Sequence, residues 1–344
     1  MKKILYLLSI VILLYSCENQ DIEFPDFAYQ TVYFPFQTPL RSIMLGNEVI
    51  GDNSIDLEHA FSVGVSIGGM YENIKDKEVS IELAPELATN IQDGSGNDLQ
   101  LLPAQYYTAV FDKITIPAGS FFGKLRVNLT DAFFADALSI DLHYILPLRI
   151  TAAAGDSILS GEPVEGVVSP DPRNPNDWIT PPLNYVLFGV KYINATHGVY
   201  LLRGKRTNTT DAQDVVTYSS RFVTGNDMTK LTTKSMTENY LSTVGGTNKE
   251  SANAKYSMLL TFNNSTKSVI ISQKSAATVV VNGTGTFYDK ADPQAEGYNG
   301  EKHRTIYLDY TYVDAGKTYH TNDSLVFVDT DMKFETFSIQ VVNP

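Results

Sequence analysis

The sequence predicts an all-β protein of two domains, a β-sandwich followed by an antiparallel meander that closes into a barrel or forms a second sandwich. Three observations support this fold class. Apolar and polar residues alternate with period two along most of the chain, helical periodicity is nearly absent, and one proline-rich stretch separates two series of such segments.

The first series lies between residues 27 and 168 and predicts the sandwich. Short strands separated by turns at close spacing are typical of this architecture. Pro147 lies inside one strand and has no N–H to donate to a ladder, so it predicts a sheet edge or a bulge. The clearest alternating segments are 61–68, 79–83, 124–129 and 144–150.

The stretch from Ser169 to Pro182 interrupts the alternation. It contains five prolines in fourteen residues. Such a composition predicts a stiff connector without strands. We therefore expect a linker at 169–182 and a second domain at 183–344.

The second series predicts the meander. Sequential strands with short turns pair with their neighbours, and closing the sheet into a barrel removes its exposed edges. Gly283 and Gly285 stand two apart in one strand, which suits a sharp bend in a curved sheet. The predicted strands are 199–203, 256–262, 267–273, 279–287, 305–313, 324–328 and 334–342.

The first residues predict a lipoprotein signal peptide at 1–16. Lys2 and Lys3 precede an apolar run that is too short to span a membrane as a stable helix. Ser16 comes directly before Cys17, and this junction resembles a bacterial lipobox. Cys17 is also the only cysteine, so we expect it to carry the lipid, the alternative being an unpaired thiol.

The predicted tether at 17–26 is acidic. Glu18, Asp21 and Glu23 follow the cysteine closely. This spacing resembles the surface-export signal of Bacteroidota lipoproteins, and an ordinary solvated tether is the alternative. The expected location is the outer membrane, with the folded part facing the cell exterior and lipid as the only membrane attachment.

The charge balance excludes classes of partner. The chain has 26 basic and 39 acidic residues, a net charge of −13. Loss of the signal peptide removes two lysines and leaves 24 against 39, a net charge of −15. An acidic surface repels nucleic acid and anionic membranes, so we expect neither as a partner.

Two pairs of segments resemble known domains. Ile114–Ser120 with Tyr144–Thr151 resembles the immunoglobulin-like N-terminal domain of Bacteroidota outer-membrane lipoproteins, and Gly198–Lys205 with Asp323–Phe327 resembles the β domain that often follows it. The resemblance implies an immunoglobulin-like sandwich, and it implies a protein from a glycan-utilisation locus. Relatives are encoded beside SusC/SusD-like importers and are associated with glycan binding. The family supplies no established site residues.

No catalytic, cofactor or metal signature is present in the sequence. The five histidines form no HExxH pair, and GxSxG, P-loop and GxGxxG motifs are absent. Asp93–Asp98 resembles part of a calcium loop, but Ala104 stands where an EF-hand needs glutamate, so a polar hairpin turn is the preferred interpretation. Calcium in another geometry stays open. We expect no enzyme activity, no cofactor and no metal.

Sugar binding needs an aromatic ring for stacking and nearby polar groups for the hydroxyls. Each candidate also has a structural interpretation, as a plug between domains, a solvated loop or a cross-strand packing pair. The candidates are Trp178 in the connector, the loop residues Tyr288, Asp289, Tyr298 and Asn299, and Tyr307 with Asp309 on one strand face.

The preferred hypothesis is a non-catalytic surface lipoprotein that binds a glycan for a SusC/SusD-like uptake system. The first alternative is a structural or adhesive protein with a protein partner. The second is a lipocalin-like barrel that holds a small apolar ligand, and a hydrolase ranks last.

Overall fold

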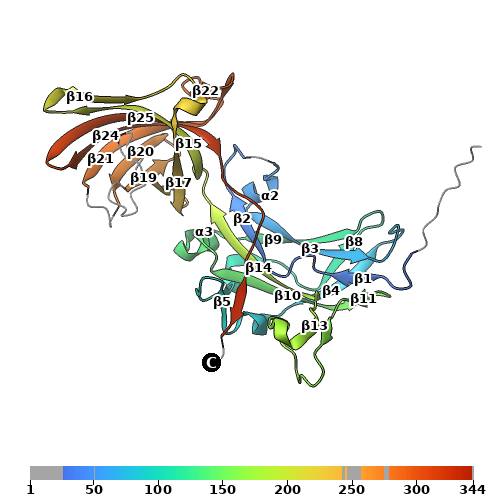
Figure 1. The fold of residues 1–344 in the computed structure, drawn as a ribbon. Helices are drawn as coiled ribbons and strands as arrows, with labels where there is room; N and C mark the ends of the chain where they lie inside the picture. Colours follow the sequence, from blue (N-terminus) through green and yellow to red (C-terminus); the bar gives the residue numbers. More distant parts are fainter. Residues whose placement is uncertain (1–25, 50, 242–244, 246–256, 275–278, 343–344) are drawn as a thin grey trace, which may run out of the picture.

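The chain folds into two β-rich lobes (Figure 1). The computed structural model describes residues 26–49, 51–241, 245, 257–274 and 279–342, so Cys17 and the predicted signal peptide lie outside the described residues. Strands make up 52% and helices 9% of the structure, and the C-terminal region contains a closed barrel of eight strands. The predicted fold class is confirmed, with the barrel as the C-terminal architecture.

The N-terminal lobe is a sandwich of two sheets. The first sheet has the order β11-β1-β3-β9-β7, with the bounds Ser157–Ile158, Thr31–Tyr33, Ala60–Gly68, Phe122–Leu129 and Tyr107–Thr108. The second has the order β26-β2-β14-β10-β4-β8, with the bounds Glu335–Thr336, Pro39–Met44, Tyr185–Ile193, Tyr144–Ala153, Lys77–Leu83 and Lys113–Ile116. A short strand, β6 (Gln100–Leu101), adds beside β10.

Short helical turns connect these strands. Two are α-helical and the others are 3-10 turns of three or four residues. Their brevity agrees with the lack of helical periodicity in the sequence. They are α2 (Ser54–Leu57), α3 (Asp131–Ala135), η1 (Pro85–Ala88), η2 (Ala104–Tyr106), η3 (Ala137–Ile140), η4 (Pro175–Asp177) and η5 (Val223–Gly225).

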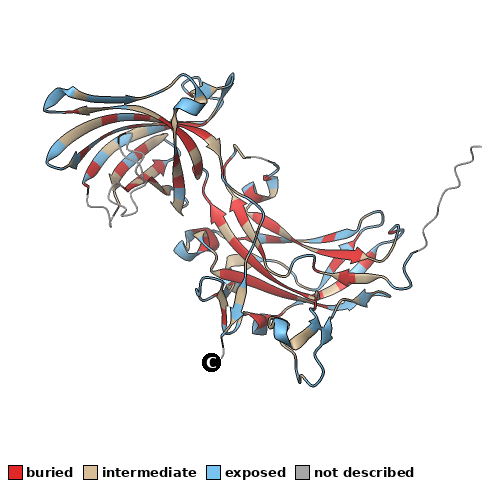
Figure 2. Ribbon diagram, viewed as in Figure 1, coloured by how far each residue is buried: buried red, intermediate tan, exposed pale blue. Residues whose placement is uncertain are grey.

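The alternating apolar residues of both sheets form one core. Phe61 from β3 and Phe188 from β14 stack with ring centroids 5.0 Å apart, although the two residues lie far apart in the sequence. Figure 2 shows buried residues along the facing strands of this lobe and exposed residues at its turns. Burial of each large apolar side chain contributes about 1.5–3 kcal/mol, so this core is the main source of the lobe's stability.

The strand β14 belongs to the sandwich, although it follows the predicted linker. It pairs antiparallel with β10 and parallel with β2, so it lies inside the second sheet. A strand that is covered on both faces has a continuous apolar sequence, and such a sequence does not indicate which sheet the strand joins. The predicted start of the second domain at 183 therefore precedes the last interior strand of the first.

The predicted strand-free linker contains a strand. The short strand β13 (Trp178–Thr180) pairs antiparallel with β12 (Glu162–Pro163), and the turn between them packs against the sandwich. Prolines at the ends of such short strands leave the paired N–H groups in place. The stretch 169–182 is thus part of the N-terminal lobe.

Pro147 lies in the interior strand β10, contrary to the prediction of a sheet edge. On one side of β10 the neighbour changes from β6, which ends beside Ile145, to β4, which begins opposite Leu148. Pro147 stands at this change and its carbonyl accepts from the N–H of Ala84. The missing proline N–H falls where the ladder is already interrupted.

The C-terminal lobe is a meander that closes on itself. Consecutive strands pair antiparallel, and β25 pairs back with β15 to complete the barrel, while β16 and the hairpin β22–β23 lie outside the ring. The strands are β15 (Gly198–Asn208), β16 (Asp211–Tyr218), β17 (Asp227–Ser235), β18 (Glu238–Leu241), β19 (Met258–Asn263), β20 (Ser268–Gln273), β21 (Val281–Tyr288), β22 (Gly297–Tyr298), β23 (Glu301–Lys302), β24 (Thr305–Asp314) and β25 (Lys317–Asp329).

Side chains fill the barrel interior. Its described core residues are at most 8% exposed, and Tyr200, Met258 and Tyr310 are at most 1% exposed. A side chain at Gly283 would meet the Asp309 carbonyl oxygen at 2.3 Å and Tyr310 Cβ at 2.5 Å, so the glycine permits the close approach of β24. An interior occupied in this way among the described residues counts against a small apolar ligand inside the barrel.

The end of the chain returns to the sandwich, so the prediction of a barrel strand at 334–342 was wrong. After β25, residues 330–334 lead to β26, which pairs antiparallel with β2, and β27 (Ile339–Val341) then pairs with β5 (Ile91–Asp93). Figure 1 shows this segment running from the barrel down the side of the other lobe. In the described part of the chain no helix has the length and apolar character needed to cross a bilayer.

Candidate functional site

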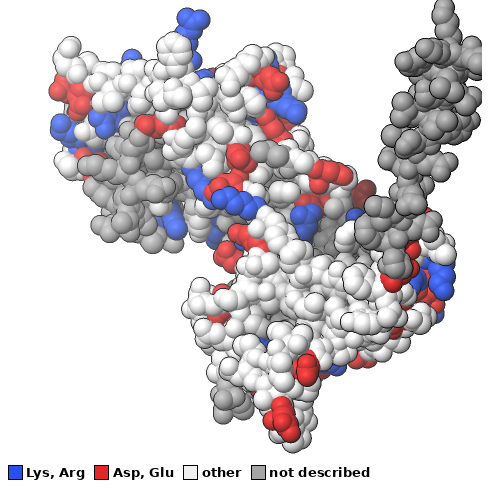
Figure 3. Space-filling model, turned by 45° about the vertical axis from the view of Figure 1, so that its right-hand side comes forward, with Lys and Arg blue, Asp and Glu red and all other residues white. Residues whose placement is uncertain are grey.

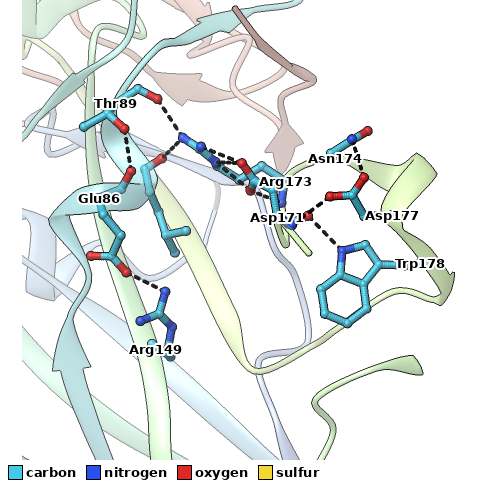
Figure 4. A network of polar contacts seen from close by, with 9 residues as sticks. Glu86, Thr89, Arg149, Asp171, Arg173, Asn174, Asp177 and Trp178 are labelled. Carbon is cyan, nitrogen blue, oxygen red and sulfur yellow. Dashed lines mark hydrogen bonds and ion pairs between the residues drawn. The ribbon is translucent and has the colours of Figure 1, made fainter. Parts of the chain in front are cut away.

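Trp178 lies in a polar network on the N-terminal lobe. Its indole N–H donates to the Asp171 carbonyl oxygen at 2.8 Å, and Asp171 is paired with Arg173. Arg173 donates onward to the carbonyl oxygen of Thr89 at 2.7 Å. Figure 4 shows these residues close together. In Figure 1 the strand β13 lies at the opposite end of the molecule from β22. Trp178 therefore does not share a site with the barrel loop.

The Tyr288–Asn299 loop begins a second group at the end of the barrel that faces the sandwich. The rings of Tyr288 and Tyr307 meet edge to face with centroids 6.0 Å apart. The Tyr307 hydroxyl donates to the Gln294 carbonyl oxygen at 2.9 Å, which holds the loop against β24. Burial raises the pKa of Tyr307 to about 12, so this hydroxyl stays protonated.

Tyr298 supports the contact between the two lobes. Its ring stacks on His303 with centroids 4.1 Å apart. His303 Nδ1 lies 2.8 Å from one carboxylate oxygen of Glu48, whose other oxygen accepts from the N–H of Arg304 at 2.9 Å. Since Glu48 belongs to the sandwich, Tyr298 is engaged in packing this junction and offers little free ring face for a ligand.

Asn299 and Asp309 lie apart from this group. Asn299 is exposed at the tip of the β22–β23 turn with a φ of 53°. Asp309 accepts from His320 Nε2 at 2.7 Å and from Asn322 Nδ2 at 3.0 Å on the outer wall of the barrel. The structure thus brings together Tyr288, Asp289 and Tyr307 of the predicted site residues.

A pocket of about 240 Å³ lies beside them, between the barrel and the sandwich. We call it the barrel-base pocket. It receives Asn47 from the sandwich, Asn264 and Lys267 from the β19–β20 turn, and Asp289 from the end of β21. Its remaining lining residues are Leu45, Ala195, Thr196, Phe287 and Arg304.

Charge fixes the orientation of Lys267 at this pocket. Its ammonium group lies 2.9 Å from Asp292 Oδ2 and 5.7 Å from the centroid of the Tyr288 ring. The hydrogen bond to Asp292 raises the pKa of Lys267, while the backbone N–H of Gln294 and this lysine lower the pKa of Asp292. Both groups stay charged at neutral pH.

The side chains of the pocket suit a polyhydroxylated ligand. Two amides and a carboxylate supply acceptors, the amides, Lys267 and Arg304 supply donors, and Phe287 and Leu45 supply apolar surface. Among the described lining residues Asp289 is the one carboxylate. Pockets for drug-sized ligands measure roughly 300–1,000 Å³, so this smaller one matches a single sugar ring.

The sequence contained no sign of several pocket residues. Asn47 reaches the pocket from the other lobe, and no local pattern connects it with Asp289. Asn264 lies in the hairpin turn between β19 and β20, in which Asn263 Oδ1 accepts from the N–H of Ser265 at 3.0 Å. Lys267 ends the turn with a φ of 53°.

A second polar cluster forms around Asp323, in the middle of β25. Asp323 is 4% exposed and accepts from the hydroxyls of Tyr218 and Tyr310, the latter at 2.6 Å. Burial raises the pKa of Asp323 to about 6 in spite of these two bonds. An acidic residue on an inward strand position was the available sequence signal.

The Asp93–Asp98 segment forms a turn on the surface of the N-terminal lobe. Asp93 Oδ1 accepts from the N–H groups of Ser95 at 2.8 Å and Asn97 at 2.9 Å, as in a polar hairpin turn. Within the described ranges no three His, Cys, Asp or Glu side chains are grouped to hold a metal ion. On the face drawn in Figure 3, acidic and basic side chains are interspersed over both lobes.

Family comparisons match both lobes separately. Residues 27–157 match a family model described as "-like, N-terminal domain", and residues 195–331 match a domain of unknown function, DUF5627. The first model ends before β14 and the second begins just after it, so the two matches correspond approximately to the sandwich and the barrel. No curated protein matches the chain.

Two solved structures from Bacteroides species are similar only at low identity and with low TM-scores. An auxiliary nutrient binding protein from Bacteroides thetaiotaomicron is 13% identical, with 83% of this chain and 89% of that chain covered and a TM-score of 0.37. A Bacteroides ovatus protein with an assignment to carbohydrate binding is 13% identical, with 91% of this chain and 98% of that chain covered and a TM-score of 0.27.

One solved structure is similar along its whole length. It is a Bacteroides ovatus protein of unknown function, 34% identical, and the alignment covers 92% of this chain and 100% of that chain with a TM-score of 0.80. Identity at this level over both lobes indicates common descent as well as a common fold. The chain belongs to the same protein family as this Bacteroides ovatus protein.

Proposed function

We propose that the chain is a non-catalytic binding protein that holds one sugar unit of a glycan in the barrel-base pocket. The observation that carries the proposal is the convergence of Asn47, Asn264, Lys267 and Asp289 around about 240 Å³. These residues come from three separate segments and two lobes. Amide and carboxylate groups beside an aromatic surface are the usual means of orienting a sugar ring.

The neighbouring aromatic pair extends this surface. Tyr288 and Tyr307 are half-buried on the outer wall of the barrel, next to Asp289. A second unit of the same glycan would stack on these rings after leaving the pocket. The ligand we propose is thus a chain of sugars gripped at one unit.

The cellular setting is part of the proposal. The lipobox-like sequence supports lipid attachment at Cys17, and the acidic tether supports display at the outside of the outer membrane. A SusC/SusD-like importer would then take over the captured glycan. Incorporation of labelled palmitate, and its loss in Cys17→Ser, tests the anchor separately from binding.

A glycan array tests the ligand class. The fragment 18–344, which retains every described strand, is applied to plant, fungal and host polysaccharides. We expect retention of one class of glycan. Failure to retain any of them would contradict the proposal.

Paired variants test the pocket. Asn264→Ala and Asp289→Ala should each weaken binding of the retained glycan about tenfold, since a hydrogen bond is worth about 1–1.5 kcal/mol and 1.4 kcal/mol is a factor of ten. Asp211→Ala is the matched control, because Asp211 is exposed at the β15–β16 turn and does not line the pocket. Equal loss in the control would remove the pocket from the proposal.

A further inference from the structure

A larger and more apolar groove lies on the sandwich, away from the barrel-base pocket. It is bounded on one side by residues 329–334, which we call the strap, and on the other by β2 and β3. Its volume is about 520 Å³, and core residues such as Phe34, Val63 and Phe188 form its floor. We call it the strap groove.

One wall of the groove is the edge of a sheet. The N–H of Leu45 donates to Ile193 of β14, so by strand alternation the backbone groups of Leu40, Ser42 and Met44 point away from β14. They point toward the side on which β26 approaches. A sheet edge of this kind presents N–H and C=O groups to any strand that can reach it.

The chain itself covers both ends of this edge. At one end β26 pairs with Pro39 and Leu40, and there its ladder stops. At the other end the Met44 N–H donates to Asp56 Oδ2 at 2.9 Å. Ser42 stands between these two contacts and lines the strap groove.

The Ser42 side chain has an unmet hydrogen bond. The residue is 8% exposed, and its Oγ has no hydrogen-bond partner in the structure. A buried hydroxyl without a partner costs about 1–3 kcal/mol. An incoming polar group that reached the groove would remove this cost.

Two exposed phenyl rings mark the mouth of the groove. Phe36 is 48% and Phe334 67% exposed, and their centroids lie 4.9 Å apart. One ring comes from the β1–β2 connection and the other from the strap. Together they offer apolar surface to a side chain of a ligand that enters between them.

We propose that the strap groove binds an extended polypeptide segment of a partner protein, which adds to the edge of β2 at Ser42. The occupant follows from continuity with β26, which already pairs with the adjacent residues of the same edge. Strand addition supplies backbone hydrogen bonds, and pockets for alternate side chains supply specificity. The segment therefore has apolar residues at every second position.

The experiment uses a phage library of random decapeptides, selected on the 18–344 fragment. We expect the enriched peptides to alternate apolar and polar residues. A synthetic copy of the most enriched peptide should bind at least tenfold more weakly to Phe36→Ser/Phe334→Ser, whose altered side chains are exposed. Binding of this peptide to the wild-type fragment should slow hydrogen exchange of the Ser42 amide by at least tenfold.

Phe222→Ser is the matched control, because Phe222 is 72% exposed on the barrel lobe and does not line the strap groove. Its peptide affinity should equal that of the wild type. Enrichment without alternation, equal loss in the control, or an unchanged Ser42 amide would each overturn the proposal. So would dimerisation through Phe334, since a second copy would then be the occupant. Glycan binding at the barrel-base pocket is measured on the same variants and should not change.

Discussion

The two lobes solve the problem of sheet edges differently. The barrel closes through β25 and β15, so its ring of strands has no edge. The sandwich keeps the edge of β2 and covers part of it with β26, a strand that arrives from the end of the chain. Local closure makes the barrel self-contained, whereas the sandwich depends on distant segments and leaves room for a groove. The predictions below test this difference.

The largest expected effect is on the sandwich. Deletion of residues 330–344 removes β26, β27 and the half-buried Phe337 and Ile339. We expect the sandwich to lose about 3–5 kcal/mol. Two half-buried side chains account for about 1.5–3 kcal/mol, and the rest comes from backbone hydrogen bonds worth about 0.5–1.5 kcal/mol each, such as that from the Phe337 N–H to the Thr38 carbonyl oxygen. For a lobe of this size that is a fall in melting temperature of about 10 °C.

The single tryptophan makes this measurement specific. Trp178 lies in the N-terminal lobe, so its fluorescence follows sandwich unfolding, while far-ultraviolet circular dichroism follows both lobes. The barrel transition should stay within a few degrees of the wild type. An unchanged Trp178 transition would contradict the dependence of the sandwich on the returning segment.

The next effect, of about 3 kcal/mol, concerns acid stability in the barrel lobe. Burial lowers the pKa of His197 to about 4 from 6.5, so the unfolded chain binds more protons and stability falls as the pH drops from 6.5 to 4. The raised pKa of Asp323 acts in the opposite direction, because the folded chain binds more protons between pH 6 and 4. The two contributions nearly cancel in the wild type.

Substitutions separate these contributions. In Asp323→Asn the loss at His197 is no longer offset, and we expect the barrel's free energy of unfolding to fall by about 3 kcal/mol between pH 6.5 and 4. In His197→Gln it should rise over the same range. Urea unfolding of the barrel at several pH values provides the measurement, and parallel curves for the two variants would refute the assignment.

The locality of the barrel also explains what the sequence could predict. Each barrel hairpin joins neighbouring segments, so alternation predicted strands such as 267–273 and 305–313, although it missed β16, β17 and β18. The membership of β14 in the sandwich was not predictable, because a strand buried on both faces shows no alternation. The pocket residue Asn47 was equally hidden, since its partners lie more than 200 residues away.

The predicted site residues show the same limit. Tyr298 is a residue type that often binds sugars, but its ring stacks on His303 and its hydroxyl donates to the Phe327 carbonyl oxygen. Tyr288 and Asp289 lie at a pocket because the turn at Lys267 and the sandwich loop approach them. Aromatic and polar composition predicts a binding surface only when the packing leaves it free.

Glycine substitutions compare the tightness of the two lobes. In Gly283→Ala the new methyl group would meet the Asp309 carbonyl oxygen at 2.3 Å, so β21 and β24 must separate. We expect a loss of about 2 kcal/mol, as is usual for overpacking. Gly64→Ala is the matched control in the sandwich strand β3, where the nearest atom lies at an ordinary 3.5 Å. Thermal melts in which both variants behave alike would contradict this difference in packing.

The smallest expected effect concerns the junction between the lobes. Glu48→Ala removes the acceptors for His303 and the Arg304 N–H, and two such hydrogen bonds are worth about 1–3 kcal/mol together. Because the strap and the β14–β15 connection still join the lobes, we expect about 1 kcal/mol and a wider separation of the two thermal transitions. Glu48→Gln retains an acceptor for the Arg304 N–H and should recover most of the loss. If Glu48→Ala instead lowered both transitions equally, the lobes would be unfolding as one unit, and the contrast between a self-contained barrel and a dependent sandwich would fail.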